Sequence, residues 1–158
     1  MGTPVRRRPP LFSLPLVWLV SRMDALRAWA SRGRTPPRRA LGRRAEDLAH
    51  RFLQKKGYRI LARNWTGPHL AEVDIVASDG ERTVFVEVKS RQADEHGSPD
   101  RAVDAIKQIA QRRAARAWAR AARIDESAIR FDLITVVFTQ PPRIEHQADA
   151  WSLHGGRS

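Results

Sequence analysis

The chain has 158 residues and a formal net charge of +12, and 42% of its residues are hydrophobic. This length predicts one folded domain, and the absence of cysteine excludes disulfides, cysteine-ligated metal centres and thiol nucleophiles. Nine arginines against Asp24 give residues 1–40 a charge of +8, so +4 remains for residues 41–158. We therefore expect a basic N-terminal tail over 1–40, a folded domain over 41–151 and a short C-terminal tail over 152–158.

Within the expected tail, residues 11–20 are apolar, but Pro15 interrupts them, and ten residues are too few to span a bilayer. Two other interpretations stay open: an interfacial helix over 16–30, and a true start at Met23 that would delete the apolar run. We favour a tail that the fold does not need, no stable membrane span, and a cytoplasmic location, which fits the absence of cysteine.

A helix is expected over 41–56, where apolar residues recur at helical spacing and Gly57 follows. Glu46 lies beside the apolar arc of this helix. Spacing alone favours an ordinary boundary carboxylate, and the alternative is that Glu46 leans over the sheet edge toward an acidic patch. A first strand is predicted over 58–65. Its alternate residues should share one face: Tyr58, Ile60 and Ala62.

Two alternating, β-branched segments flank Asp79-Gly80 and predict a β-hairpin over residues 71–91. Antiparallel pairing around this turn should bring Asp74 near Glu87. Because alternate residues share a face, Lys89 should lie on the face of Glu87. If the register sum is odd, the Asp74 side chain joins that face.

The hairpin therefore predicts a patch of carboxylates, with Glu72 as a further member on the face of Asp74. Carboxylates this close repel one another, and oxygen ligands suit Mg²⁺ or Mn²⁺. The spacing Asp-x12-Glu-x-Lys, ending at Lys89, has the form of the PD-(D/E)xK nuclease motif. A short motif arises often by chance, so the competing interpretation is a solvated strand face with alternating charges.

A long helix over 100–123 and strands over 130–139 and 143–151 complete the order α-β-β-β-α-β-β. This order predicts an α/β fold, a mixed sheet flanked by helices. Lys107 lies at the edge of the apolar arc of the long helix and can reach the sheet. The arc that should pack on the sheet consists of Val103, Ile106, Ala110, Ala114, Ala117 and Ala121.

The opposite side of the long helix carries a basic stripe of Arg112, Arg116, Arg120 and Arg123. Charges at helical spacing usually mean a solvated face, and the functional alternative is a ridge that contacts phosphates. Asp132, inside an apolar strand, needs a partner such as a core-edge lysine or arginine. The histidines have no metal-ligand spacing and are expected on the surface or in loops: His50, His69, His96, His146 and His154.

Several segments in order resemble the YraN-like family of proteins classed with endonucleases: LGRRAEDLAHRFLQKKGYRILARNW, AEVDIVASDGERTVFVEVKSR, HGSPDRAVDAIKQ and RFDLITV. The resemblance covers about residues 41–151. It implies a restriction-endonuclease-like fold of the PD-(D/E)xK superfamily, similar in layout to archaeal Holliday-junction resolvases. Two positions depart from the family pattern, Ala71 for a glycine and Thr66 for an arginine. The matching positions are Gly42, Glu46, Gly57, Asn64, Glu72, Asp74, Glu87, Lys89, Arg91, Gly97, Lys107 and Asp132.

The leading hypothesis is metal-dependent hydrolysis of a nucleic-acid phosphodiester, with DNA expected ahead of RNA and a branched substrate suggested by the resolvase-like layout. Asp74 and Glu87 would hold Mg²⁺ or Mn²⁺, Lys89 would orient the attacking water, and Glu46 would complete the acidic cluster. Glu72 and Lys107 are supporting candidates. The expected nucleic-acid contacts are Arg91, Arg112, Arg116 and Arg120.

Two rival readings belong to other classes. The first is a nucleic-acid-binding module that keeps a nuclease fold without turnover, because fold does not fix function. The second is a membrane-associated protein that uses residues 11–30. Whether the chain forms a homodimer stays open on sequence alone.

Overall fold

The computed structural model describes residues 37–67, 71–93 and 105–154. The expectations for residues 1–36, including the apolar run, the interfacial helix and the Met23 start, lie outside these residues. Residues 94–104, between the predicted hairpin and the described part of the long helix, lie outside them as well. The same holds for His69, His96, Gly97 and Val103.

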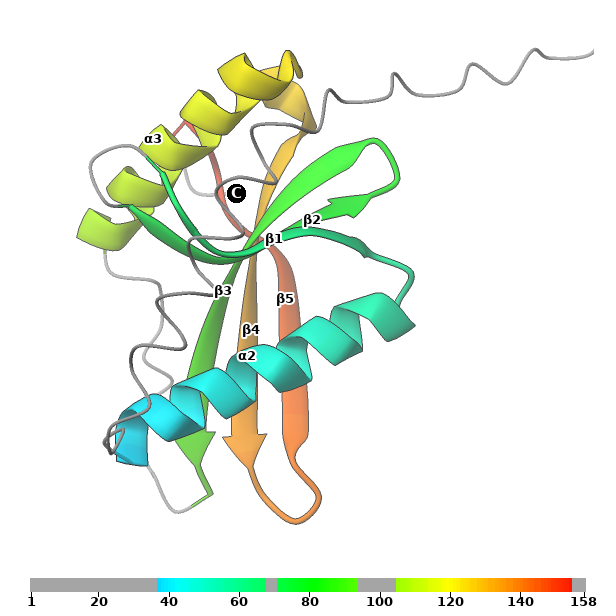
Figure 1. The fold of residues 1–158 in the computed structure, drawn as a ribbon, viewed down its shortest axis with the longest axis vertical. Helices are drawn as coiled ribbons and strands as arrows, with labels where there is room; N and C mark the ends of the chain where they lie inside the picture. The colour runs from blue at the N-terminus through cyan, green and yellow to red at the C-terminus, as the bar shows by residue number, and fades with distance from the viewer. Residues whose placement is uncertain (1–36, 68–70, 94–104, 155–158) are drawn as a thin grey trace, which may run out of the picture.

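The described elements follow the predicted order α-β-β-β-α-β-β. They are α2 (Pro37–Lys55), β1 (Arg59–Thr66), β2 (Glu72–Asp79), β3 (Arg82–Gln92), α3 (Ala105–Ala122), a 3-10 turn η2 (Glu126–Ala128), β4 (Ile129–Phe138) and β5 (Arg143–Trp151). The strands form one sheet in the order β1-β2-β3-β4-β5. Only β3 and β4 pair in parallel in this sheet, so the fold is a mixed α/β sheet flanked by two described helices, as predicted (Figure 1).

Helix α2 begins at Pro37, four residues before the expected start at Leu41. Proline suits the first turn of a helix, because its missing N–H has no intrahelical partner there. Helix α2 therefore begins inside the segment that the sequence assigned to the tail. At the other end Gly57 adopts a φ of +89°, and the Tyr58 N–H donates to Leu53 O at 3.0 Å. Glycine at this left-handed position ends the helix as expected.

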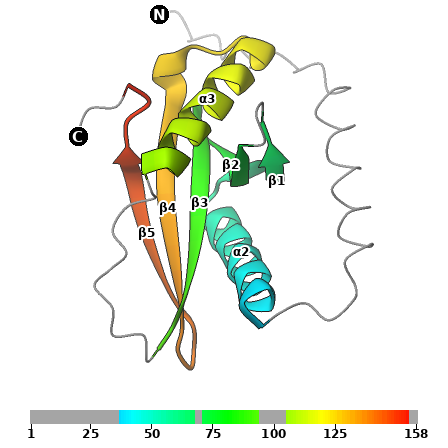
Figure 2. The same ribbon diagram turned by 90° about the vertical axis from the view of Figure 1, so that its left-hand side faces the viewer.

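The sheet carries a packed core on each face. On one face, Ala45, Ala49 and Leu53 of α2 pack against strand residues that include Ile75 and Ile134. The opposite face holds the aromatic core under α3. Figures 1 and 2 show the two helices toward opposite ends of the long axis of the molecule. The aromatic core contains Phe85, Phe131, Trp151, Trp65 and Trp118.

Strand β1 does not keep one face throughout, and the prediction that Ala62 lies with Tyr58 and Ile60 is wrong. The β1–β2 register shifts between Ile60 and Ala62. An extra residue in one strand turns the following side chains to the other face. Tyr58 and Ile60 therefore pack in the α2 core, whereas Ala62 packs in the aromatic core.

The predicted hairpin is confirmed. Asp79 pairs with Arg82 across a two-residue turn, and Gly80 takes a φ of +61°. Pairing runs up to Ile75 with Val86, a register whose sum is odd. By this register Asp74 and Glu87 are the next residues in line and share a face.

Helix α3 is rotated relative to the predicted arc. Ile106 of that arc is 75% exposed and Ile109, outside it, is 48% exposed, while the buried residues are Gln111, Ala114, Ala115 and Ala119. Trp118 explains the rotation, because its ring packs edge-on against Trp65 with centroids 5.1 Å apart. A tryptophan can bury more apolar area than any one of the alanines that defined the predicted arc.

The basic stripe on α3 is not one solvated face. The Arg112 Nε donates to Ser152 O at 2.7 Å, and the Arg116 guanidinium donates to Leu153 O at 3.1 Å. Leu153 is 6% exposed and belongs to the aromatic core, so the packed core includes a residue beyond the expected domain end at residue 151. Arg112 and Arg116 therefore hold the C-terminal segment. Arg120 and Arg123 remain exposed.

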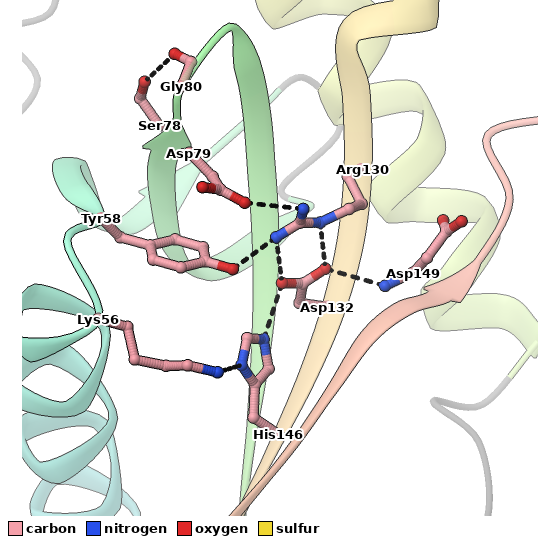
Figure 3. A network of polar contacts seen from close by, with 9 residues as sticks. All are labelled: Lys56, Tyr58, Ser78, Asp79, Gly80, Arg130, Asp132, His146 and Asp149. Carbon is pink, nitrogen blue, oxygen red and sulfur yellow. Dashed lines mark hydrogen bonds and ion pairs between the residues drawn. The ribbon is translucent and has the colours of Figure 1, made fainter.

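Asp132 has the arginine partner that its burial demanded, together with a histidine (Figure 3). The Arg130 guanidinium donates to both Asp132 oxygens at 2.9 and 3.0 Å, and His146 Nε2 lies 2.8 Å from Oδ2. These partners hold the Asp132 pKa below its usual value although burial alone would raise it. The surface assignment of His146 is wrong, because its side chain is 5% exposed. His50 also departs from it, since it is half-buried in α2.

Neither α2 nor α3 is long and apolar enough to cross a membrane.

Candidate functional site

The candidate site begins where β2 and β3 stop pairing. Beyond Ile75 and Val86 the next residues in register are Asp74 and Glu87. Asp74 Oδ2 accepts a hydrogen bond from the Val88 N–H at 2.7 Å. The Asp74 carboxylate thus accepts the hydrogen bond that a backbone carbonyl of a paired strand would otherwise accept from Val88. This bond fixes Asp74 beside Glu87. The sequence prediction that these two residues converge is confirmed.

Glu87 is a buried carboxylate, with 1% of its surface exposed. Its two oxygens have different partners. Oε1 lies 2.5 Å from Lys107 Nζ and 3.3 Å from Lys89 Nζ, whereas Oε2 accepts from Gln111 Nε2 at 2.9 Å. A buried charge needs paired cations and satisfied oxygens. Glu87 has both, and its two cationic partners among the described residues approach the same oxygen, Oε1.

Asp74 is partly buried and less well compensated. Burial raises its pKa to about 7, the neighbouring Glu87 adds to the rise, and the Val88 N–H and Lys107 oppose it. A carboxyl in this state is ready to give up its proton when a cation arrives. Burial therefore raises the Asp74 pKa more than the repulsion between the two carboxylates does.

Lys107 belongs to the site, as predicted from its position on the long helix. Burial by itself would lower its pKa, but the bond to Glu87 and the charges of Glu87, Asp74 and Glu72 raise it. Lys107 therefore stays charged and acts as a built-in counterion. Lys89, with 40% of its side chain exposed, places a second ammonium on the open side of Glu87.

Glu46 approaches the acidic pair from α2. It bonds the Asn64 side chain and raises the Asp74 pKa electrostatically, as the smallest contribution in a series led by burial. Asn64 has a φ of +47°, a conformation that asparagine tolerates better than most residues. This kink in β1 directs Arg63 to Asp47 of α2, at 2.6 Å, and positions the Asn64 side chain beside Glu46. Glu46 thus acts on Asp74 electrostatically, and its membership of the acidic patch stays a prediction.

The other predicted site residues lie farther from the pair. Glu72 is exposed at the start of β2 and acts only electrostatically on Lys107. Arg91 is half-buried and, by alternation along β3, lies on the face of Glu87 and Lys89. Arg112 and Arg116 donate hydrogen bonds to the backbone carbonyls of the C-terminal segment.

Gln111 is the site residue that sequence analysis missed. It follows Lys107 by one helical turn, so the two side chains lie on the same side of α3. The available signal was the spacing Lys-x3-Gln on a helix next to the hairpin. The predicted arc placed Gln111 off the packed side, because the arc followed the alanines.

The donor set fits a divalent cation only in part. In the ranges 37–67, 71–93 and 105–154, no three His, Asp or Glu side chains are arranged to hold an ion. Asp74 and Glu87 do offer two converging carboxylates, and the negative charge of Asp74 is only partly offset by its hydrogen bond and by Lys107. Mg²⁺ is commonly held by one or two carboxylates, with waters and substrate phosphates completing its shell. Two carboxylates are therefore sufficient for an ion that arrives together with a phosphate.

The raised pKa of Asp74 predicts a distinctive pH dependence in Asp74→Asn. Because the folded-state pKa of about 7 exceeds the ordinary 3.8, folding takes up a proton, and this stability is lost as pH rises from about 4 to 7. Without divalent ions, the free energy of unfolding of Asp74→Asn relative to wild type should rise by on the order of 2 kcal/mol between pH 5 and pH 8. Urea unfolding at both pH values measures it. A constant difference would show that Asp74 titrates normally.

Comparison with known proteins places the chain in a family. The model of the uncharacterised protein family UPF0102 matches residues 45–136, which include both acidic residues of the pair. A UPF0102 protein of Solibacter usitatus is 46% identical over 66% of this chain and 80% of its own length. One from Geobacter metallireducens is 40% identical over 73% of this chain and 94% of its own. The chain therefore belongs to UPF0102, the YraN-like family that its sequence segments resemble.

Proposed function

We propose that this protein is a metal-dependent endonuclease that hydrolyses nucleic-acid phosphodiester bonds. The observation that carries the proposal is the convergence of Asp74 and Glu87 with two ammonium groups beside them. A cation, a phosphate and a water can all be recognised at such a place. The arrangement supports a restriction-endonuclease-like fold of the PD-(D/E)xK type, with the substrate proposed as DNA ahead of RNA.

Asp74 and Glu87 would hold Mg²⁺ or Mn²⁺, with the Val88 carbonyl as a further oxygen. When bound, the ion lowers the pKa of a water and polarises the phosphoryl oxygen. Glu46 lies on the α2 side of the pair and would hold a second water.

The two lysines have different roles, and Lys89 would stabilise the negative charge that develops on the phosphate. Lys89 is the more exposed of the two and lies beside Glu87 Oε1, so its ammonium can face a phosphate without leaving the site. Lys107 neutralises the buried Glu87 carboxylate until a cation binds. Exposed Arg120 and half-buried Arg91 are the remaining candidates for phosphate contacts, which carry no sequence information.

The competing proposal is a binding module without turnover. It is favoured by the pairing of Glu87 with Lys107, which leaves the metal-free site largely neutralised. In this alternative the basic residues bind nucleic acid and the acidic pair is structural. The difference between the two proposals is whether a divalent ion is needed.

A cleavage panel tests the function. Branched, duplex and single-stranded DNA and RNA are incubated with the full chain in Mg²⁺, Mn²⁺ or EDTA. We expect cleavage that needs the ion and falls by at least about 100-fold in Asp74→Ala, while binding in an electrophoretic assay persists. If the protein binds the substrates but cleaves none of them in either ion, the endonuclease proposal is wrong and the binding-module alternative holds.

A further inference from the structure

The strongest unexplained feature outside the predicted residues is the Gln111 side chain. It is 1% exposed on the sheet-facing side of α3. Its Nε2 donates to Glu87 Oε2 at 2.9 Å, and its Oε1 is buried with no partner in the part of the chain that the structure describes. A buried amide oxygen left unpaired costs about 1–3 kcal/mol. The position therefore carries a polar group that helix packing alone does not require.

The orientation of the amide follows from its neighbour. A carboxylate only accepts hydrogen bonds, so Gln111 must present its NH₂ group to Glu87. The amide oxygen then points elsewhere, yet it cannot be far away. Given the dimensions of an amide, Oε1 lies within roughly 5 Å of Glu87 Oε2. An unpaired acceptor is thus fixed close to the Glu87 carboxylate.

The partners of Glu87 divide by oxygen. Both ammonium groups approach Oε1, and Gln111 alone among the described side chains holds Oε2. This division orients the carboxylate and keeps Oε1 on the side where cations gather. Ions such as Mg²⁺ usually retain several waters, whose hydrogens need acceptors in the surrounding protein.

We propose that Gln111 is a positioning residue of the candidate metal site, whose Nε2 fixes Glu87 and whose Oε1 accepts a hydrogen bond from a water of the bound divalent ion. This inference rests on the proposed function and deepens it. The alternative is that Gln111 Oε1 is satisfied by an ordinary buried water that has no link to an ion.

The test measures metal affinity, with activity left aside. Calorimetric titration of Mn²⁺ and Mg²⁺ into the full chain is compared for wild type, Gln111→Leu and Gln111→Glu. Gln111→Leu keeps the size of the side chain and removes both polar atoms, so Kd should rise by about 10–100-fold. Gln111→Glu restores an oxygen acceptor and adds negative charge, so its Kd should fall back below that of the leucine variant.

Gln108→Leu is the matched control, because it makes the same change on the same helix at a side chain whose amide oxygen accepts a hydrogen bond from Arg112. Its Kd should stay within about twofold of wild type. Circular dichroism melts establish that each variant folds, and if the leucine variant fails, Gln111→Met replaces it.

The outcomes separate the two proposals. If wild type binds the ion and Gln111→Leu binds it equally well, the role of Gln111 is overturned while the metal site stands. If wild type binds neither ion at millimolar concentration, even with nucleic acid present, the metal site and the role of Gln111 both fail.

Discussion

We expect Glu87→Gln to abolish metal binding and cleavage while the chain still folds. The substitution removes one negative charge from the acidic pair with little change of shape. It leaves Lys107 without its carboxylate partner, but 37% of the Lys107 side chain is exposed, so water can solvate the ammonium. Wild type should gain stability from Mn²⁺ by mass action, and the variant should gain none.

Lys89→Met is the companion substitution with the opposite effect on the ion. It removes a positive charge 3.3 Å from Glu87 Oε1, so metal affinity should hold or improve. Cleavage should still fall by about 10²–10³-fold, because the charge developing on the phosphate loses its ammonium. One variant loses the ion, and the other keeps the ion and loses the chemistry.

Glu81→Gln is the matched control, since Glu81 is exposed in the turn of the same hairpin. Calorimetric titration and a single-turnover cleavage assay give the two readouts. Cleavage by Glu87→Gln at the wild-type rate would rule out this carboxylate as a metal ligand. Loss of metal binding in Lys89→Met would show that Lys89 supports the fold of the site and has no separate part in the chemistry.

The sequence was sufficient for the hairpin and its acidic pair because the signals there are local. Asp79-Gly80 sets the turn, the two-residue period sets the faces, and together they determine that Asp74 approaches Glu87. The same holds for Asp132, whose place in an apolar strand demanded a cationic partner. These inferences need only a strand, a turn and the cost of burying charge.

Other features depend on contacts between distant segments and could not be predicted. The side of α3 that packs on the sheet is chosen by Trp118 meeting Trp65, two residues far apart in the chain. That choice brings Gln111 to Glu87 and turns Arg112 toward Ser152. The bulge in β1 is equally hidden, since no residue pattern marks where a strand takes an extra residue. Periodicity describes one element at a time, whereas these features arise between elements.

Removal of the Arg130 side chain should have the largest effect on stability. Arg130 is 10% exposed and its guanidinium bonds Asp132, Asp79 and Tyr58, so Arg130→Met leaves the fully buried Asp132 with His146 and one N–H as partners. Breaking a buried ion pair from one side costs about 3–5 kcal/mol. We expect the melting temperature to fall by roughly 10–20 °C.

The pH dependence separates lost charge pairing from lost packing. In wild type the Asp132 pKa is lowered, so its contribution is present above the ordinary pKa and lost as pH falls below it. Without Arg130 the carboxyl should take up a proton at higher pH, and the stability gap between variant and wild type should narrow from pH 7 to pH 4.

Arg143→Met is the control, because Arg143 and Glu145 form an ion pair with side chains 68% and 57% exposed. Its stability should change by less than about 0.5 kcal/mol. A loss below about 1 kcal/mol in Arg130→Met would mean that His146 and the Asp149 N–H are sufficient to hold the buried charge.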